Sequence, residues 1–305
     1  MSTLLIVGSA NADHVLTFEN LPQAGETLLC QQYRLELGGK GANQAVATAR
    51  LRNPQQTVCF IAALGHDNNA DMMRKAWSED DIDISGCYQI ANQSTGTAMI
   101  FVDQQGENSI GIVPGANTCL GSEHFRQQHA KFEQANYMLI QLETTLDSVQ
   151  SALQLARQYD CTTILNPAPA TALSKEILNL VDIITPNETE ALALTGVEVN
   201  DQLSASKAAD YFHQQGVNSV VITLGSKGAY VSEQGKGEGK IIPAPIVTAI
   251  DTVAAGDTFN GAMMVALDEG KSLQEAVIFA NKASSIAVTR HGAQSSIPYR
   301  DQLND

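Results

Sequence analysis

The chain has 305 residues and a formal net charge of −15, from 33 acidic and 18 basic side chains. A surface this acidic repels the phosphates of nucleic acids and anionic lipid headgroups, so we expect neither nucleic acid nor a membrane as a partner. The five cysteines form no CxxC pair. That absence argues against a zinc site or a disulfide framework and favours a reducing, cytoplasmic setting.

Short apolar runs alternate with longer helical patterns along most of the chain. Strands are predicted at 4–7, 57–62, 137–141, 162–165, 182–185 and 219–223. Helices are predicted at 43–50, 69–79, 146–159, 205–215, 257–267 and 273–289. This alternation predicts a single Rossmann-like α/β domain over 1–305, with a mostly parallel sheet and helices on both faces. In such sheets, ligands bind at the carboxyl ends of the strands.

Two segments, about 14–37 and 94–113, show strand patterns without intervening helices. They predict a small separate β-sheet that forms a lid over the ligand. The stretch 97–102 is nearly all apolar, so it cannot present a polar outer face by alternation. An exposed apolar sheet usually marks an interface, and we expect a homodimer in which two lids cover each other. The alternative is a monomer whose lid packs on its own domain.

A glycine-rich segment, Gly38-Gly39-Lys40-Gly41-Ala42-Asn43, lies between a strand pattern and a helix. Its glycines allow positive φ and a close approach to a ligand, and the helix that follows supplies free N–H donors. The segment matches neither the P-loop nor the GxGxxG pattern. An ordinary glycine-rich turn explains these residues equally well.

Small residues, Ala254, Ala255 and Gly256, precede Asp257 at the start of an amphipathic helix. Their backbone N–H groups are placed to stabilise negative charge at the helix N-terminus. A carboxylate beside such an anion hole suits phosphoryl transfer, because it can take the proton of the attacking hydroxyl. A helix N-cap is the commonest role of Asp at a helix start, but a cap does not require the small residues before it.

Two further motifs follow predicted strands. Asn187 and Glu190 are three residues apart at a helix start, a spacing that suits hydrated Mg²⁺. A capping box has the same pattern and is the more ordinary interpretation of this pair alone. The loop from Thr223 to Gly228 suits either a nucleotide or a plain β-turn.

Polar residues also follow the strands predicted at 4–7 and 137–141. Asn11 and Asp13 come after the first of these strands, and Glu143 comes after the second. At the ligand edge of a parallel sheet, these side chains offer the paired acceptors that the hydroxyls of a polyol need. As isolated residues, each of them is more often structural.

In this order, the segments GGKGANQA, NPAPA, TPNETE, TLGSKG and DTVAAGDTFNGA resemble the PfkB, or ribokinase, family of carbohydrate kinases. The resemblance extends from Gly8 to Pro298. It implies an enzyme that uses ATP, with Mg²⁺ and an activating K⁺, to phosphorylate D-ribose at its primary 5-hydroxyl. It also implies a homodimer that pairs through the lids.

The family pattern assigns roles position by position. Asp257 matches the catalytic base, and Ala254, Ala255 and Gly256 match the anion hole. The positions that match sugar-binding residues are Asn11, Asp13, Gly39, Lys40, Asn43, Glu143 and Asp257. Those that match the nucleotide site are Asn187, Thr223, Gly225, Ser226, Gly228, Gly256 and Asn281, and Asn187 with Glu190 matches the magnesium motif. Those that match a monovalent-cation site are Asp251, Val253, Ala287, Arg290, Gly292 and Ser296.

The sequence departs from the family pattern at two positions. Asn281 stands where close relatives often have His near the adenine, and Ser295 replaces a common proline. Two other functions stay open: a kinase of the same fold for another sugar (deoxyribose or fructose) or a nucleoside, and a sugar sensor without activity. A nucleoside would require apolar walls for its base, whereas the acceptor positions here are polar. The intact Asp257 argues against the sensor.

Overall fold

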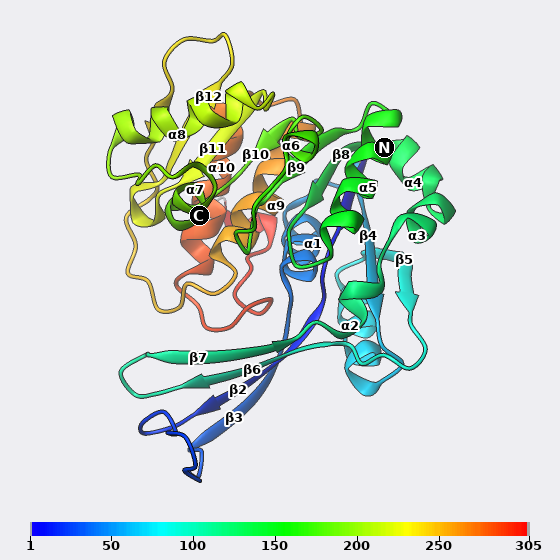
Figure 1. The fold of residues 1–305 in the computed structure, drawn as a ribbon, viewed down its shortest axis with the longest axis vertical. Coiled ribbons are helices and arrows are strands. Elements are labelled where there is room, and N and C mark those ends of the chain that lie inside the picture. Colours follow the sequence, from blue (N-terminus) through cyan, green and yellow to red (C-terminus); the bar gives the residue numbers. More distant parts are fainter. Residues whose placement is uncertain (1, 304–305) are drawn as a thin grey trace.

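A computed structural model describes residues 2–303 of the chain, which form a large α/β body with a smaller sheet extending from one side (Figure 1). The large sheet has nine strands in the order β13-β12-β11-β10-β9-β8-β1-β4-β5. All neighbours from β5 to β11 pair in parallel, and only β12 and β13 pair antiparallel at one edge. The predicted fold class is therefore confirmed.

The strands of the large sheet are short. They are β1 Ser2–Val7, β4 Gln56–Leu64, β5 Asp83–Gln89, β8 Ala135–Ile140, β9 Thr162–Leu165, β10 Ile183–Ile184, β11 Ser219–Thr223, β12 Ala229–Glu233 and β13 Lys240–Ile242. In β1, all four residues from Leu4 to Val7 are fully buried. A continuous apolar run of this kind is typical of a parallel strand that is covered on both faces.

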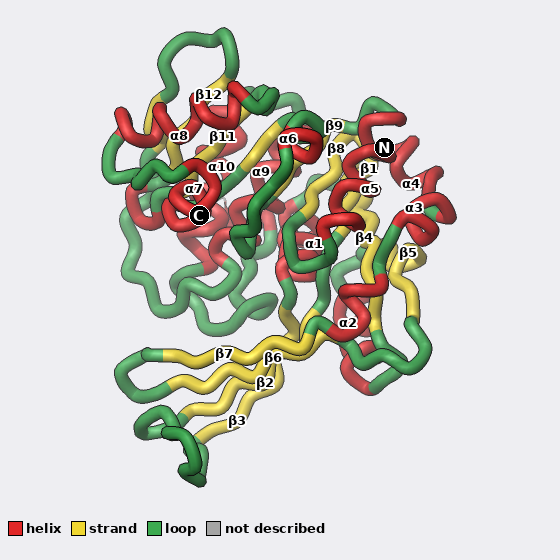
Figure 2. The backbone as a smooth tube through the Cα atoms, in the orientation of Figure 1, coloured by secondary structure: helices red, strands yellow, loops and turns green. Residues whose placement is uncertain are grey.

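Helices cover both faces of the large sheet (Figure 2). One face packs against α1 (Lys40–Leu51), α2 (Asn68–Glu79), α9 (Ala255–Asp268) and α10 (Leu273–Ala287). The other face packs against α3 (Ser122–Gln127), α4 (His129–Gln134), α5 (Leu146–Gln158), α6 (Lys175–Leu178), α7 (Glu188–Thr195) and α8 (Gln202–Gln214). Four helices begin earlier than the sequence predicts: α1 and α8 by three residues, α9 by two and α2 by one.

The second sheet has four strands in the order β3-β2-β6-β7 (Figure 2). Its strands are β2 Asn11–Thr17, β3 Gln32–Gly38, β6 Gly96–Val102 and β7 Asn108–Val113. The pair β2–β6 is parallel, and the other two pairs are antiparallel. The stretch 18–31 has no strand, although the sequence pattern suggests strands there, and β2 already begins at Asn11.

The small sheet joins the body through very short connections. Residues 8–10 alone separate β2 from β1, and Gly39 alone separates β3 from α1. Gly39 has a φ of 87°, and a Cβ there would lie 2.7 Å from the backbone N of Asn11. Glycine is therefore required where β3 passes this close to the root of β2.

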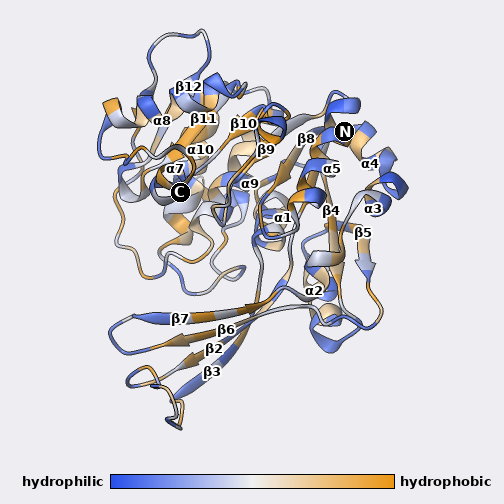
Figure 3. Ribbon diagram, in the orientation of Figure 1, coloured by the Kyte–Doolittle hydropathy of each residue, from blue (hydrophilic) through white to orange (hydrophobic). Residues whose placement is uncertain are grey.

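The two faces of the small sheet follow from its register. Asp13, Ala98 and Ile112 lie opposite one another across β2, β6 and β7, so they share one face. The other face has four exposed apolar side chains, Tyr33, Leu35, Met99 and Val113. The exposed apolar side chains of this face thus come from β3, β6 and β7. Figure 3 shows apolar stretches in β6 and β7, and the sheet lacks the polar outer face that ordinary alternation gives.

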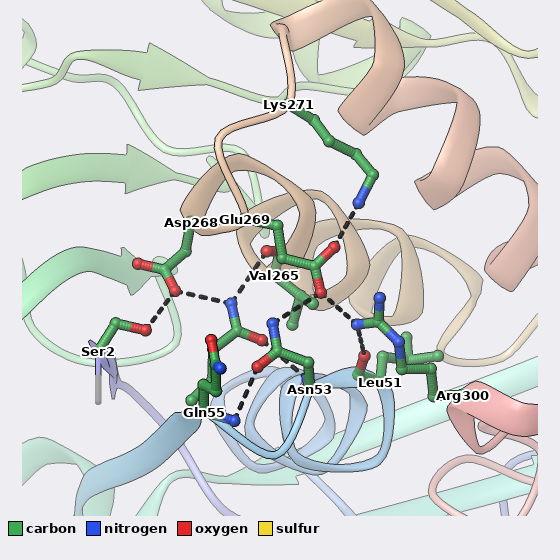
Figure 4. A network of polar contacts seen from close by, with 10 residues as sticks. Ser2, Leu51, Asn53, Gln55, Val265, Asp268, Glu269, Lys271 and Arg300 are labelled. Atoms are coloured by element: carbon green, nitrogen blue, oxygen red, sulfur yellow. Dashed lines mark hydrogen bonds and ion pairs between the residues drawn. The ribbon is translucent and has the colours of Figure 1, made fainter.

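A polar network ties the end of α9 to the end of α1 (Figure 4). Glu269 accepts a hydrogen bond from Asn53 at 3.0 Å and pairs with Lys271 and Arg300. Burial opposes ionisation of Glu269, but the hydrogen bonds from Arg300, Lys271 and Asn53 outweigh it and lower its pKa to about 2. Arg300 also donates to the carbonyl of Leu51 at 2.9 Å. The network holds together the two helices whose opposite ends reach the functional site.

Within residues 2–303, no helix has both the length and the apolar composition that crossing a bilayer requires.

Candidate active site

A cavity of about 620 Å³ lies at the carboxyl ends of the parallel strands, beneath the inner face of the small sheet. Its wall comes from β2, β6, β7, the glycine-rich start of α1 and the start of α9. The predicted site residues that line it are Asn11, Asp13, Gly39, Lys40, Asn43, Glu143, Asn187, Glu190, Thr223, Gly225, Val253, Ala254, Ala255, Gly256 and Asp257. Segments far apart in the sequence therefore meet in one place.

Asp257 lies in the first turn of α9 and is only 6% exposed. Asn43 Nδ2 donates to its Oδ2 at 3.0 Å, and Gln44 Nε2 donates to its Oδ1 at 2.9 Å. Burial raises the pKa of Asp257, while Lys40 and the two amide donors act in the opposite direction. A buried carboxylate with a raised pKa beside a cavity is the kind of group that enzymes use as a general base.

The start of α9 lines the cavity with the small residues Ala254, Ala255 and Gly256. Its N-cap is Ala254, which has no side-chain hydrogen bond to the helix and adopts the left-handed conformation, with φ 58° and ψ 11°. The first N–H groups of a helix have no intrahelical partner. The backbone N of Ala255 already donates to the carbonyl oxygen of Thr252 at 3.2 Å, so among the described hydrogen bonds this turn leaves the N–H groups of Ala254 and Gly256 to a ligand. This turn has the geometry of an anion hole.

Asp13 lies in β2, on the cavity wall opposite the start of α9, and its pKa is strongly shifted. Burial, followed by repulsion from Glu143, Glu36 and Asp257, raises its pKa from 3.8 to about 7. A Cβ at Gly38 would lie 2.0 Å from Asp13 Oδ2, so the neighbouring strand leaves room for this carboxylate only because glycine is there.

The polar side chains beside Asp13 are held in place by hydrogen bonds within the protein, which use only part of their hydrogen-bonding capacity. Glu143 Oε2 accepts from Ser9 Oγ at 2.6 Å and from the backbone N of Lys40 at 2.9 Å. Asn117 Nδ2 donates to Asn11 Oδ1 at 2.8 Å, so Asn11 has its NH₂ group available to a ligand. Burial lowers the pKa of Lys40, but attraction to Asp257, Glu143 and Glu190 outweighs it and raises that pKa overall.

Asn187 and Glu190 form the capping box of α7, because each side chain bonds the backbone N of the other. Both residues also line the cavity, so the capping role does not remove them from the site. Burial raises the pKa of Glu190, against the opposing hydrogen bond from Asn187 and the charge of Lys40. Within residues 2–303, no group of three His, Cys, Asp or Glu side chains is arranged as a metal site. A divalent cation here needs phosphate and water oxygens as well.

A second cavity of about 610 Å³ adjoins the first and shares Gly225, Thr252 and Ala255 with it. Its wall includes Ala244, Pro245, Ile246, Val247, Ser226, Asn281, Ser284, Ser285 and Val288. Asn281 is buried, and its Nδ2 donates to the carbonyl of Ile242 at 3.1 Å. Gly228 lines neither cavity. Its φ of 100° shapes the turn between β11 and β12, where a Cβ would lie 2.1 Å from the carbonyl oxygen of Ile242.

The positions that match a cation site come from two segments that meet behind the anion hole. Asp251 Oδ1 accepts from the backbone N of Val253, and Asp251 Oδ2 accepts from that of Gly292, each at 3.0 Å. Ala287 is the last residue of α10, and Ser296 is fully buried in the loop beyond it. Arg290 donates from its side chain to Gln302. Of the six positions, Val253 alone lines the large cavity.

The sequence interpretation misses several cavity residues. From the small sheet these are Ala98, Ile100, Ile110 and Ile112, and from the body they include Asn166, Thr185 and Asn260. Strand alternation places Ala98 with Ile100 and Ile110 with Ile112 on shared faces, but it does not show which face of each strand lines a cavity. Gln44, which bonds Asp257 without lining the cavity, is also missed.

The model of the pfkB family carbohydrate kinases matches residues 1–300. A ribokinase of Haemophilus influenzae is 49% identical over 300 residues, which cover 98% of this chain and 96% of that protein. A ribokinase of Staphylococcus aureus is 42% identical, with 99% and 98% of the two chains covered.

Among solved structures, Arabidopsis thaliana ribokinase complexed with ribose and ATP superposes with a TM-score of 0.94 at 32% identity, covering 100% of this chain and 98% of that one. The match therefore extends over both sheets and all the segments that build the cavity. With a family match over nearly its whole length and relatives above 40% identity, this chain belongs to the pfkB family of carbohydrate kinases.

Proposed function

We propose that the protein is an ATP-dependent kinase that transfers the γ-phosphoryl group of ATP to the 5-hydroxyl of D-ribose, giving ribose 5-phosphate and ADP. The observation that carries the proposal is the position of Asp257, whose carboxylate lies between the polar wall suited to a polyol and the start of α9, where the N–H groups of Ala254 and Gly256 are left to an anion. This arrangement places a general base and a phosphate-binding turn next to each other. The choice of ribose as the acceptor rests on the similarity to ribokinases.

On the sugar side, Asp13 and Glu143 accept hydrogen bonds from ring hydroxyls, and Asn11 donates. These groups are fixed before the sugar arrives, because Ser9 and Asn117 already hold one side of Glu143 and Asn11. Asp257 then takes the proton of the primary hydroxyl as the hydroxyl oxygen of the sugar attacks the γ-phosphorus and ADP leaves. Preset groups of this kind reduce the entropy lost on reaching the reactive geometry.

On the phosphate side, the N–H groups of Ala254 and Gly256 face the negative charge of the transferring group, while that of Ala255 bonds the carbonyl of Thr252 until a ligand displaces it. Lys40 lies near Asp257, Glu143 and Glu190, where its ammonium offsets their repulsion of a nucleotide. Asn187 and Glu190 would hold Mg²⁺, with water completing its coordination. When bound, Mg²⁺ neutralises charge on the β- and γ-phosphates. The second cavity receives the adenosine, and its apolar wall of Ala244, Pro245, Ile246 and Val247 suits the base.

We also propose that K⁺ binds around Asp251 and activates the enzyme. The carboxylate of Asp251 and backbone carbonyls are oxygen ligands, which suit an alkali cation. Asp251 already connects the segment before α9 to Gly292. A cation here would order the turn that leads to the anion hole without touching the sugar.

The small sheet is proposed to act as the lid of the sugar site and as the contact of a homodimer. Its inner face puts Ala98, Ile100 and Ile112 against the cavity, which excludes water from the reacting groups. Its outer face exposes Tyr33, Leu35 and Met99. A twofold contact covers this apolar face with a copy of itself.

The chain is further proposed to work as one domain, with the lid as an insertion, in the cytoplasm. The five cysteines are unpaired, as expected where thiols stay reduced. Three of them, Cys59, Cys87 and Cys161, are buried in the body.

A panel of sugars tests the proposed reaction. ADP release is measured with ATP, Mg²⁺ and K⁺ for ribose, 2-deoxyribose, fructose, adenosine and no acceptor. We expect ribose to give the highest kcat/KM. Higher kcat/KM for another acceptor would reassign the substrate, and sugar binding without ADP release from any acceptor would favour the sensor.

A further inference from the structure

Gln44 is fully buried on α1, one residue after Asn43, and uses its whole side-chain amide in hydrogen bonds. Nε2 donates to Asp257 Oδ1 at 2.9 Å and to Asn166 Oδ1 at 3.1 Å. Oε1 accepts from Gln141 Nε2. Unlike Asn43, Gln44 does not line the cavity, so it reaches the site only through its neighbours.

The two oxygens of Asp257 have different partners. Oδ2 accepts from Asn43, which lines the cavity and is proposed to contact the sugar. Oδ1 accepts from Gln44, which is shielded from the cavity. A single donor would leave the carboxylate free to rotate about its Cβ–Cγ bond, whereas donors at both oxygens fix its plane.

The orientation of this hydrogen-bond chain follows from Asp257. A flipped Gln44 amide would set its oxygen against the carboxylate, so Gln44 has to present NH₂ to Asp257 and its oxygen to Gln141. Gln141 then has to turn its own NH₂ towards Gln44. Its Oε1 is left buried and, among the described residues, without a hydrogen-bond partner. A buried oxygen without a partner lowers stability, so the hydrogen bonds from Gln141 through Gln44 to Asp257 need an explanation other than stability.

The packing of α1 on α9 is also adapted to this contact. Gly261 lies one turn beyond Asp257, and a Cβ there would come within 2.7 Å of Ala47 Cβ and 3.0 Å of the carbonyl oxygen of Gln44. Without a side chain at Gly261, the two helices approach closely enough for the Gln44 amide to reach Asp257.

We infer that Gln44 is a positioning residue for the general base, and that its amide fixes the carboxylate of Asp257 so that the Oδ2 edge faces the sugar hydroxyl. The inference rests on the proposed function, because it assumes that Asp257 is the base. It predicts that removing the amide misaligns the base while leaving the nucleotide site intact.

The test replaces Gln44 with methionine, which keeps the length but removes both donors. We expect kcat for ribose to fall by about 10²-fold, since small misplacements of reacting groups have effects of this size. KM for ATP should not change. Thr48→Val is the matched control, since Thr48 is buried one turn further along α1 and bonds only the backbone carbonyl of Gln44. It should retain wild-type kcat.

Two readouts separate positioning from a merely structural role. First, in an Asp257→Asn background, Gln44→Met should cause no further loss, because a residue that acts through the base has nothing left to position. Second, the acid limb of the pH profile of kcat should move to higher pH, because the base loses a donor to its ionised form. The charged groups around Asp257 are Lys40, Glu143, Asp13 and Glu190, and they are the same in both proteins.

If Gln44→Met does not fold, Gln141→Leu replaces it. That variant keeps the donors of Gln44 but releases their orientation, so we expect a smaller loss of kcat and the same direction of pH shift. Wild-type kcat with an unshifted profile, or a loss that adds fully to that of Asp257→Asn, would overturn the inference. Absence of sugar phosphorylation by the wild-type protein would instead overturn the proposed function, so the two failures are distinguishable.

Discussion

Replacing Asp257 with asparagine separates binding from chemistry at the centre of the site. In the wild-type protein, both carboxylate oxygens accept hydrogen bonds, at 3.0 Å from Asn43 and 2.9 Å from Gln44. In the variant, the NH₂ group of the new asparagine replaces one acceptor oxygen and faces the NH₂ group of Asn43 or Gln44, which costs about 1–3 kcal/mol. Removing a buried charge offsets part of that cost, so we expect the variant to fold and to bind ribose.

The effect on the reaction is expected to be much larger. Loss of a general base lowers kcat by about 10²–10⁴-fold, and each factor of ten corresponds to about 1.4 kcal/mol of barrier. Ribose-dependent ADP release gives kcat, and calorimetry gives the dissociation constants of ribose and ATP for the same sample. The matched control is Asp71→Asn, because Asp71 is an exposed acidic residue in the first turn of α2. Near-wild-type turnover of Asp257→Asn would remove Asp257 from the mechanism, and equal losses in both variants would point to helix stability instead.

Four further predictions concern the other parts of the molecule. With wild-type protein, 2-deoxyribose should have a markedly lower kcat/KM than ribose, because the missing hydroxyl leaves buried acceptors near Asp13 unpaired, at about 1–3 kcal/mol; equal values for the two sugars would contradict this. The folded pKa of Asp13 is raised from 3.8 to about 7, so its contribution to stability is full below the unfolded value and is lost as the pH rises through 7. Between about pH 5 and pH 8, the melting temperature of Asp13→Asn should therefore fall less than that of the wild type. An equal decrease in the two proteins would refute the pKa shift. Activity in K⁺ should exceed activity in tetramethylammonium, and Asp251→Ala should abolish the difference; a wild-type rate that ignores the salt would exclude the cation site. In light scattering, Met99→Asp should have the mass of a monomer, 32.5 kDa, whereas the control Glu79→Gln, changed at an exposed residue of α2, should keep the mass of a dimer. A wild-type mass of 32.5 kDa at all concentrations would exclude the dimer.

The architecture was predictable because its signals are local. Buried strands such as β1 are continuous apolar runs, and the helices that follow have amphipathic spacing. The meeting of Asn11, Lys40 and Asp257 in one cavity was also within reach, since carboxyl ends of parallel strands share one edge. These expectations needed the order of the elements along the chain but no side-chain geometry.

The partners of the site residues were not predictable in the same way. Gln44 and Gln141 are 97 residues apart, and their contact depends on how α1 sits against β8. The inner and outer faces of β6 could not be told apart by composition, because Ile100 and Met99 are both apolar. Only the register with β2 and β7 shows that Ile100 faces the cavity and Met99 faces away from it.

The absence of a linker between the lid and the body has an evolutionary consequence. Asn11 and Asp13 lie at the start of β2, which pairs with β3 and β6, the strands that carry outer-face residues such as Leu35 and Met99. In addition, β3 passes directly into α1 through Gly39. In the proposed function, Asn11 and Asp13 of the sugar site and the proposed dimer contact thus lie on the same two short segments, 11–38 and 96–113, whereas Asn43, Glu143 and Asp257 belong to the body. If the proposed roles hold, exchanging these segments between relatives would change the sugar contacts of the lid and the contact between the lids together. The proposed nucleotide half, built from β11 to β13 and α10, would remain common to enzymes that differ in both.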